Sequence, residues 1–463
     1  MNIPGNFGRR VKCPCCANPW DQTGDDASNV PNGNMVCTPC LVDNKGYSGI
    51  DPDNFDLTVP PSENFYLFSN GGWRAKNPIP AEYSNWNTFI ALRDLNLERL
   101  KVILEELESS TESSPSADHA KLADFYNSFM DENTVEKSSA KSLAEVLSIC
   151  STSASDPTKA LATLHSKYGI KGLFAMYSSP DKKNSKHSIC TLTQSGLGMP
   201  DRDYYFDADK EDKRLKYTEY ISKVFSLLGT VCGVSEYSDP KSCEKAALSV
   251  MEFETLLAKA HLTRTASRDP ELTYNKMSIT ELVTLTQPEL LWANYLSSGK
   301  PSVGIEWKKY FSLIGKSAEL MGDVNVSTID ALKQASFLAS SSTLPDYLAF
   351  HAVNSCAQHL SSHFVNAHFE FHETVLKGTN EIRPRWKRAL ESLEAALGDA
   401  LGQLYVRKYF VQDAKDRYAH FVFLLFSILL FDCLSGGRVF LLSPSIMIVV
   451  ALSERHQQII LWL

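Results

Sequence analysis

Two short cysteine pairs near the N-terminus have the spacing of a zinc site. Cys13 and Cys16 form one C-x-x-C pair, Cys37 and Cys40 form the other, and 20 residues separate the two pairs. Four thiolates from two such pairs can surround a zinc ion tetrahedrally, and the metal can supply folding energy that a small segment lacks. Because the protein would fill all four positions, the predicted zinc is structural and not catalytic. Two alternatives stay open: Cys15 replaces Cys16 as a ligand, or the segment is an unstructured arm whose cysteines bind nothing.

Two histidine pairs farther along the chain have half of the pattern that a zinc peptidase needs. Such enzymes use two histidines four residues apart on a helix, with a glutamate directly after the first as the general base. His359 and His363 have this spacing, as do His368 and His372, but leucine follows His359 and phenylalanine follows His368. His372 is followed by glutamate, but Leu376 stands where the second histidine should be. We interpret these histidines as helix-surface or packing residues that form no catalytic zinc site.

The composition is that of a soluble globular protein and argues against one broad class of function. The chain has 463 residues, 43% of them hydrophobic and 22% charged, so it can bury a sizeable core. Its net charge of −8 argues against a general nucleic-acid binder, because such a protein needs a basic face. The first 30 residues contain no apolar stretch typical of a secretory signal, and the cysteines beyond residue 40 are scattered singly. These features predict a reducing, cytoplasmic location.

Three segments differ in composition and indicate the domain organisation. Residues 1–48 are rich in cysteine, glycine, proline and asparagine, which fits a small zinc-ribbon-like module. Residues 49–417 carry apolar residues at three- and four-residue steps and little strand alternation, so we expect a mainly α, multi-helix domain. The clearest helix patterns cover 87–107, 221–234, 347–372 and 385–410, and loops are predicted at 109–116, 178–185 and 297–304.

The last segment, residues 418–463, is abruptly apolar. Its most apolar run covers 421–431, which is shorter than the ~20 residues that span a bilayer. Extending the run to Leu442 brings in Asp432 and Arg438, which makes a poor membrane helix. Membrane association through this tail is therefore the less favoured alternative. We favour a peptide foreign to the rest of the chain, from a retained intron, a frameshift or an alternative transcript.

Four motifs in the middle segment occur in the same order in a known family. The first is N-F-Y-L-F-S-N-G-G-W at 64–73, followed by N-P-I-P at 77–80 and L-R-D at 92–94. The second is G-L-G-M-P-D-R-D-Y-Y at 196–205, and the third is M-E-F-E at 251–254 with R-D-P at 268–270 and Y-N-K-M at 274–277. The fourth is R-P-R-W-K-R at 383–388, which leads to L-Y-V-R-K-Y-F at 404–410. Together they make the chain resemble the neprilysin and endothelin-converting-enzyme family of zinc metallopeptidases, from about Asp51 to Arg417.

Most residues of these motifs are of types that predict a structural role. The two glycines at 71–72 predict a tight turn beside the buried ring of Trp73. The glycines and proline of 196–200 predict a loop, which the charged side chains of 201–203 fix through ion pairs or caps. The basic run at 383–388 has two readings. One is a binding patch, and the other, which we favour, is a solvated helix start or buried pairing with acidic neighbours.

The resemblance implies an activity that this sequence carries only in part. The family consists of zinc peptidases that have an H-E-x-x-H motif and cleave peptides. This motif does not occur in the 463-residue sequence. We therefore expect a chain that is truncated before the catalytic lobe and inactive alone, with catalytic zinc and peptide substrates only in a full-length form.

The resemblance also implies one substrate-binding residue. Neprilysin lends two arginines to its substrate cleft, and of the corresponding positions one is Arg93 and the other is Asn85. A guanidinium suits the carboxylate of a bound peptide through bidentate pairing. The alternative reading makes Arg93 a structural helix residue.

A second class of function stays open. In it the chain is not an enzyme, and the zinc-ribbon-like module joins a helical platform that binds peptides or a partner protein. Ser62, Asn70 and Phe129 stand where secreted relatives carry cysteines, which fits the predicted reducing location.

Overall fold

A computed structural model describes residues 51–109, 117–286, 304–315, 322–412 and 415–416. Cys13, Cys16, Cys37 and Cys40 of the predicted zinc module lie outside these residues, as does the apolar segment 418–463. The same holds for most of the predicted loops at 109–116 and 297–304. By their contacts, the described residues belong to two units, one ending at Pro80 and one beginning at Ala81.

The first unit consists of the 3₁₀ turn η3 (Pro52–Asn54) and the helix α2 (Phe65–Lys76). Asn64 caps α2, because its side-chain oxygen accepts a hydrogen bond from the backbone N–H of Leu67 at 3.0 Å. No side chain of α2 is fully buried.

The glycine pair of α2 does not form the predicted tight turn. Gly71 and Gly72 both lie inside the helix, and the ring of Trp73 is not fully buried. A Cβ on Gly71 would lie 2.5 Å from the Cβ of Asp56, and one on Gly72 would lie 2.7 Å from the carbonyl oxygen of Asp53. The glycines therefore allow the preceding segment to pack closely against the helix, Gly71 against the side chain of Asp56 and Gly72 against backbone atoms, and they do not form a turn.

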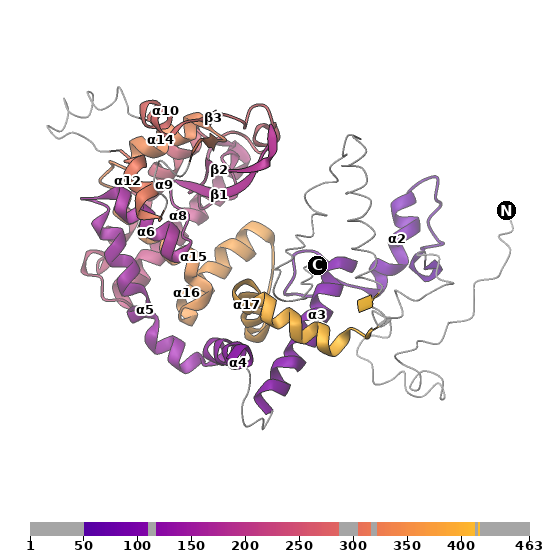
Figure 1. Ribbon diagram of the computed structural model, residues 1–463. Helices are drawn as coiled ribbons and strands as arrows, with labels where there is room; N and C mark the ends of the chain where they lie inside the picture. The colour runs from indigo at the N-terminus through magenta and orange to yellow at the C-terminus, as the bar shows by residue number, and fades with distance from the viewer. Residues whose placement is uncertain (1–50, 110–116, 287–303, 316–321, 413–414, 417–463) are drawn as a thin grey trace. The chain divides into compact units, whose positions relative to one another are not determined.

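The second unit is mostly helical, as the sequence predicted (Figure 1). Its α-helices are α3 (Thr88–Ser109), α4 (Ala117–Met130), α5 (Glu132–Thr152), α6 (Pro157–Tyr168), α7 (Asp203–Phe206), α8 (Glu211–Thr230), α9 (Pro240–Lys259), α10 (Ile279–Thr286), α12 (Trp307–Leu313), α14 (Ile329–Leu338), α15 (Leu344–Cys356), α16 (Ser362–Phe369) and α17 (Arg385–Tyr409). Shorter turns are the 3₁₀ segments η4 (Ala208–Lys210), η5 (Ser235–Tyr237), η6 (Ala266–Arg268) and η7 (Ala357–His359) and the π-helical segment η8 (Glu370–Val375). None of the described helices is both long and apolar enough to cross a bilayer.

Two of the helices begin at an aspartate followed by proline. The side chain of Asp156 accepts a hydrogen bond from the backbone N–H of Lys159 at 3.0 Å and caps α6. In the same way Asp239 accepts from the N–H of Ser242 at 3.2 Å and caps α9. The proline in the first turn has no N–H to leave unpaired, and its fixed φ suits a helix, so each start is encoded locally.

The helix predictions are confirmed where one amphipathic helix runs without interruption. The predicted helices at 87–107 and 385–410 are α3 and α17, although α17 is kinked at Leu397, whose φ and ψ are not helical. The pattern at 221–234 lies largely in α8, which begins ten residues earlier than predicted at Glu211. The single helix predicted for 347–372 is wrong, because the chain there is divided into α15, η7, α16 and η8.

A four-stranded mixed sheet accompanies the helices, and the sequence did not predict it. β1 pairs with β2 as an antiparallel hairpin, β2 pairs with β4 in parallel, and β4 pairs with β3 antiparallel. The loop predicted at 178–185 is wrong, because only residues 182–183 lie between the two strands of the hairpin. The strands are β1 (Phe174–Asp181), β2 (Asn184–Gln194), β3 (Lys276–Met277) and β4 (Val324–Val326).

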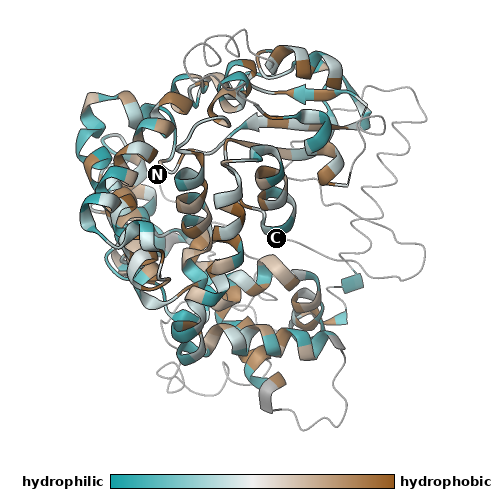
Figure 2. Ribbon diagram, turned by 90° about the vertical axis from the view of Figure 1, so that its left-hand side faces the viewer, coloured by the Kyte–Doolittle hydropathy of each residue, from teal (hydrophilic) through white to brown (hydrophobic). Residues whose placement is uncertain are grey.

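Two hydrophobic cores hold the second unit together. The larger core lies among α5, α6, α8, α9, α12, α14, α15 and one face of the sheet, and contains Trp307, Tyr347 and Phe350. The smaller core joins α3 and α4 to α17, which lie together in Figure 1, through residues such as Leu104 and Leu390. Figure 2 shows hydrophobic and hydrophilic residues alternating along the helices, which is the amphipathic pattern that packing of this kind requires.

Candidate functional site

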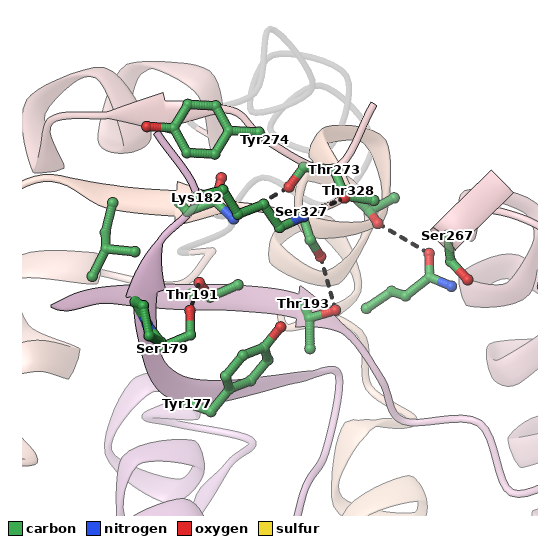
Figure 3. A pocket seen from close by; sticks show the side chains of 14 residues that line it. Tyr177, Ser179, Lys182, Thr191, Thr193, Ser267, Thr273, Tyr274, Ser327 and Thr328 are labelled. Atoms are coloured by element: carbon green, nitrogen blue, oxygen red, sulfur yellow. Dashed lines mark hydrogen bonds between the residues drawn. The ribbon is translucent and has the colours of Figure 1, made fainter. Parts of the chain in front are cut away.

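One face of the sheet lines a polar cleft, shown in Figure 3. Successive side chains of a strand point to opposite faces, and Phe174 and Leu192 point into the large core. Tyr177 lies opposite Thr191 in the β1–β2 ladder, and Thr191 lies opposite Asn325 in the β2–β4 ladder. These three residues line the other face, where the cleft has a volume of about 130 Å³.

Polar side chains of β1, of β2 and of the two residues after β4 bond to one another across this face. The Ser327 hydroxyl donates to the Thr193 oxygen at 2.8 Å, and the Thr328 hydroxyl donates to the side-chain oxygen of Gln194 at 3.1 Å. The hydroxyl oxygens of Ser179 and Thr191 lie 3.3 Å apart. The dashed lines of Figure 3 follow these contacts. These polar side chains in the floor of the cleft are therefore already hydrogen-bonded within the protein.

The rim of the cleft carries a fixed charge network. Lys182 donates to the Thr273 hydroxyl at 2.9 Å. Tyr274 donates to Asp181 at 2.8 Å, and the ammonium group of Lys276 lies 3.1 Å from the other oxygen of the same carboxylate. The hydrogen bond from Tyr274, followed by a backbone N–H and Lys276, lowers the pKa of Asp181 to about 2. Asp181 is therefore a structural anion at neutral pH.

The cleft offers hydrogen-bonding groups and one ammonium ion, but no acid–base pair. None of its lining residues is a histidine, cysteine, aspartate or glutamate. Its hydroxyl, amide and ammonium groups can donate and accept hydrogen bonds, which suits a small polar binding site. The lining residues are Tyr177, Ser179, Pro180, Lys182, Ile189, Thr191, Thr193, Gln194, Ser267, Thr273, Tyr274, Asn325, Ser327 and Thr328.

A second polar cluster lies inside the large core, around Glu254 of α9. This side chain is fully buried, and its carboxylate accepts hydrogen bonds from Tyr205, Tyr217 at 2.9 Å and the backbone N–H of Gly198 at 3.2 Å. The Nε2 atom of His351 lies 2.8 Å from the same carboxylate. Burial, together with the charge of Glu254, raises the pKa of both tyrosines well above the ordinary value, so they remain donors. Multiple donors are what a buried carboxylate needs to be tolerated.

This cluster explains the G-L-G-M-P-D-R-D-Y-Y motif. A Cβ on Gly198 would lie 1.8 Å from the hydroxyl oxygen of Tyr217, and one on Gly196 would lie 2.2 Å from that of Tyr347. Gly196 also has a φ of +88°, which side-chain-bearing residues rarely adopt. The Tyr347 hydroxyl donates to the carbonyl oxygen of Gly196 at 2.6 Å. The loop is thus held chiefly by groups of α8, α9 and α15.

The charged residues of the same loop have the role that the sequence predicted, but a smaller one. Asp201 accepts a hydrogen bond from the backbone N–H of Asp203 at 3.0 Å. Arg202 lies 3.4 Å from the carboxylate of Asp203. Both contacts are local and partly exposed, so such ion pairs contribute little compared with the buried anchors.

The histidine pairs lie in the helices and turns that follow α15. The rings of His368 and His372 stack with their centroids 4.3 Å apart, and the Nε2 atom of His372 lies 2.9 Å from the side-chain oxygen of Asn354. Both rings contact Tyr220. Burial lowers the pKa of His368 to about 4, and burial with the neighbouring histidine lowers the pKa of His372 to about 3. These two rings therefore pack as neutral groups.

The other pair is more open. His363 is exposed on α16, and His359 of η7 stacks edge-on against Phe129 at 5.5 Å. Among the described residues, no group of three or more histidine, cysteine, aspartate or glutamate side chains is arranged to hold a metal ion.

Arg93, the candidate substrate-binding residue, lies on the exposed side of α3. Its side chain is 62% exposed, and one guanidinium nitrogen lies 3.2 Å from Glu391 of α17. Asn85 precedes the helix, and its side-chain amide contacts the hydroxyl of Ser84 at 3.4 Å. The structure therefore shows Arg93 both paired and accessible.

Directly beside Arg93, a nearly buried lysine joins the two helices. Lys387 of α17 lies 2.5 Å from Asp94 and 2.6 Å from Glu82, and Tyr83 donates to Asp94 at 2.6 Å. Burial alone would lower the pKa of Lys387, but the hydrogen bonds to the two carboxylates outweigh it and raise the pKa above the ordinary value. Buried pairing, the favoured reading of the basic run at 383–388, is confirmed for this residue.

The arginines of the same run also bond within the protein. Arg383 pairs with Glu391. Arg385 donates to the backbone carbonyl of Phe129 at 2.8 Å, and Arg388 donates to that of Arg383 at 3.2 Å. The run therefore serves mainly to fix the start of α17.

Sequence reasoning found some of these residues and missed others. The cleft was not predicted, although Thr191 and Thr193 alternate with Cys190 and Leu192 in the way a half-buried strand does. Glu254 was noticed as part of a motif, but nothing in a single sequence says that a carboxylate is buried. The pairing of Asp94 with Lys387 joins residues 293 positions apart, which local patterns do not report.

Comparisons with known proteins give these features a context. The sequence profile of a family described as "Peptidase family M13" matches residues 61–425. Endothelin-converting enzyme 1 of Rattus norvegicus is 30% identical over 377 residues, which cover 79% of this chain and 46% of that enzyme. Endothelin-converting enzyme 1 of Homo sapiens is 30% identical over 375 residues, which cover 78% of this chain and 45% of that enzyme. The chain thus spans a little less than half the length of these relatives.

Solved structures agree with the sequence comparisons. The zinc metalloprotease ZMP1 of Mycobacterium tuberculosis, in complex with an inhibitor, has a TM-score of 0.69 and 27% identity, over 80% of this chain and 53% of that one. PepO from Lactobacillus rhamnosis has a TM-score of 0.60 over 78% of this chain and 54% of that one, and its 18% identity shows a common fold.

Proposed function

Because the chain belongs to peptidase family M13, we propose that it forms the mainly helical, non-catalytic part of a zinc metallopeptidase that cleaves peptides. The observation that carries this proposal is the combination of a family match over residues 61–425 with the lack of any H-E-x-x-H in the 463 residues. The motifs shared with the family lie in α2, α3, the 196–205 loop, α9 and α17, where most of their residues pack and pair as scaffold.

In this proposal the division of labour follows from the chemistry that each part can supply. A catalytic zinc polarises the scissile carbonyl and activates a water molecule. The present chain contributes binding and orientation. Its exposed Arg93 suits a carboxylate of the peptide, since a guanidinium can pair with both carboxylate oxygens. With asparagine at position 85, it offers one guanidinium where neprilysin offers two.

The proposal is tested by assaying the purified 463-residue chain with an internally quenched peptide and added zinc, beside a full-length M13 peptidase. We expect no hydrolysis that a chelator abolishes from the chain, and clear chelator-sensitive hydrolysis from the control. Chelator-sensitive cleavage that stays with the chain through several purification steps would show that the chain is itself a peptidase.

A second candidate function is peptide binding without hydrolysis. It is favoured by the accessible guanidinium of Arg93 in a chain that lacks the catalytic motif. Binding of a short peptide that survives intact would support it. A full-length transcript of the same gene encoding H-E-x-x-H, with chelator-sensitive activity of its product, would favour the peptidase instead.

A further inference from the structure

The guanidinium of Arg93 is only lightly held. A guanidinium has five N–H donors, and among the described residues Arg93 uses one of them, toward Glu391 at 3.2 Å. The side chain is 62% exposed, so solvent reaches the remaining donors. An exposed pair with one contact is weak, and a bidentate carboxylate is a stronger partner for the same group.

The backbone of Arg93, in contrast, is firmly fixed. The next residue, Asp94, lies 2.5 Å from Lys387, which is nearly buried. Lys387 and Glu391 are one turn apart on α17, and they face the adjacent residues Asp94 and Arg93 of α3. The two helices therefore meet in two ion pairs. In the largely buried pair α17 supplies the cation, and in the more exposed pair α3 supplies it. The guanidinium can change partner while its helix stays in place.

Glu391 does not depend on Arg93 for its charge balance. The same carboxylate oxygen also pairs with Arg383, whose side chain is only one-third exposed. If Arg93 turns to a ligand, Glu391 keeps one guanidinium partner. The cost of releasing Arg93 is therefore lower than it would be for an isolated ion pair, since no buried charge is left alone.

We propose that Glu391 sets the specificity for peptide carboxylates by competing with them for the guanidinium of Arg93, while Arg383 keeps Glu391 neutralised when Arg93 leaves. The inference rests on the proposed role of Arg93 in peptide binding. It adds a positioning residue on α17, Glu391, and its counter-ion Arg383, which lies two residues before that helix. The ligand chemistry is a carboxylate, from either a free C-terminus or an acidic side chain.

The test measures binding of three labelled tetrapeptides to the 463-residue chain by fluorescence anisotropy. They are a peptide with a free C-terminal carboxylate, the same peptide as its amide, and an amidated peptide ending in glutamate. In E391Q the internal competitor is removed, and we expect the carboxylate peptides to bind about two- to fivefold more tightly, with the plain amide unchanged. In R383Q, Glu391 is left to Arg93 alone, and carboxylate binding should weaken. The two carboxylate peptides show whether the terminus or the side chain is preferred.

A matched control separates this effect from general electrostatics. Glu105 is exposed and pairs with Lys101 at 3.6 Å, so E105Q makes the same charge change as E391Q, but on α3, the helix that carries Arg93. We expect E105Q to bind all three peptides like the unchanged chain. Opposite effects of E391Q and R383Q could not both come from misfolding, which would weaken binding in both.

The failures of the two ideas are distinguishable. If R93Q removes the preference for carboxylate over amide but E391Q leaves it unchanged, Arg93 binds peptides as proposed and the role of Glu391 is wrong. If R93Q leaves the preference unchanged, the proposed role of Arg93 is wrong and the inference is overturned with it.

Discussion

Single glycines contribute to this fold in different ways, and Gly198 and Gly402 are the clearest contrast. Gly198 approaches the Tyr217 hydroxyl so closely that even a methyl group has no room, because a Cβ would lie 1.8 Å from that oxygen. Gly402 lies in α17, and apart from its neighbouring residues and the backbone of its own helix no atom lies within 4 Å of the position that a Cβ would take. The first glycine is required by the buried cluster around Glu254, and the second is not required by any described contact.

We therefore expect opposite results from two substitutions by alanine. G198A should lower the free energy of unfolding by about 1–3 kcal/mol, since the overpacked site must displace a buried, hydrogen-bonded tyrosine. G402A should leave it unchanged or raise it by roughly 0.5–1 kcal/mol, because alanine is the better helix former. Urea unfolding followed by circular dichroism measures both. Equal effects would mean that the 196–205 loop is not held as described.

At the scale of elements, α17 is the centre of the smaller core, and its charged contacts to α3 can be tested separately from its apolar ones. Lys387 neutralises two carboxylates, those of Asp94 and Glu82. K387M keeps much of the side-chain volume but leaves both carboxylates without their cation.

We expect K387M to lower the free energy of unfolding by about 2–3 kcal/mol, below the ~3–5 kcal/mol of fully buried pairs because the carboxylates keep some contact with water. Lys121 offers the control: its pair with Asp118 on the surface of α4 is exposed on both sides, and K121M should cost less than about 1 kcal/mol. Chemical unfolding of both variants checks the difference. A K387M variant as stable as the parent would show that α3 and α17 do not need the buried contact.

The elements that could be predicted are those whose signal is local. α3 and α17 are long and amphipathic, so their apolar spacing was enough to find them. The helix predicted for 347–372 failed because its interruption is fixed from elsewhere. The backbone N–H of Ser361 donates to the Ser139 hydroxyl at 2.7 Å, and that of Ser362 donates to Glu136 at 2.6 Å. Side chains of α5 thus cap a new helix start in the middle of a helical pattern.

The sheet could not be predicted from the sequence for a different reason. β3 and β4 have only two and three residues, too few for an alternating pattern. The β1–β2 hairpin is longer, but the loop predicted at 178–185 covers its turn and the adjoining ends of both strands. The side chain of Asp181 accepts a hydrogen bond from the backbone N–H of Lys183 at 3.0 Å, a turn that aspartate favours. Because these strands were not predicted, the candidate cleft that they line could not be predicted either.

At the scale of the whole molecule, the family match covers residues 61–425, and the proposed zinc module precedes it. Two C-x-x-C pairs remain the basis of that proposal. Elemental analysis of the purified chain should find one zinc per molecule, and the double variant C37S/C40S should lose it. C232S, which changes a partly exposed free thiol elsewhere in the chain, should keep it. An unchanged chain that purifies without zinc would contradict the proposed module.

The contact between Arg93 and Glu391 joins residues 298 positions apart in the chain. The smaller core likewise joins α3 and α4 to α17, which is far from them in the sequence. This has a consequence for synthesis. A ribosome adds about 5–20 residues per second, so roughly 15–60 s pass between the appearance of α3 and that of α17. Of the described helices that form this core, α3 then has α4 beside it but not yet α17. The newly made helix pair therefore needs shielding from aggregation until its third helix has been translated.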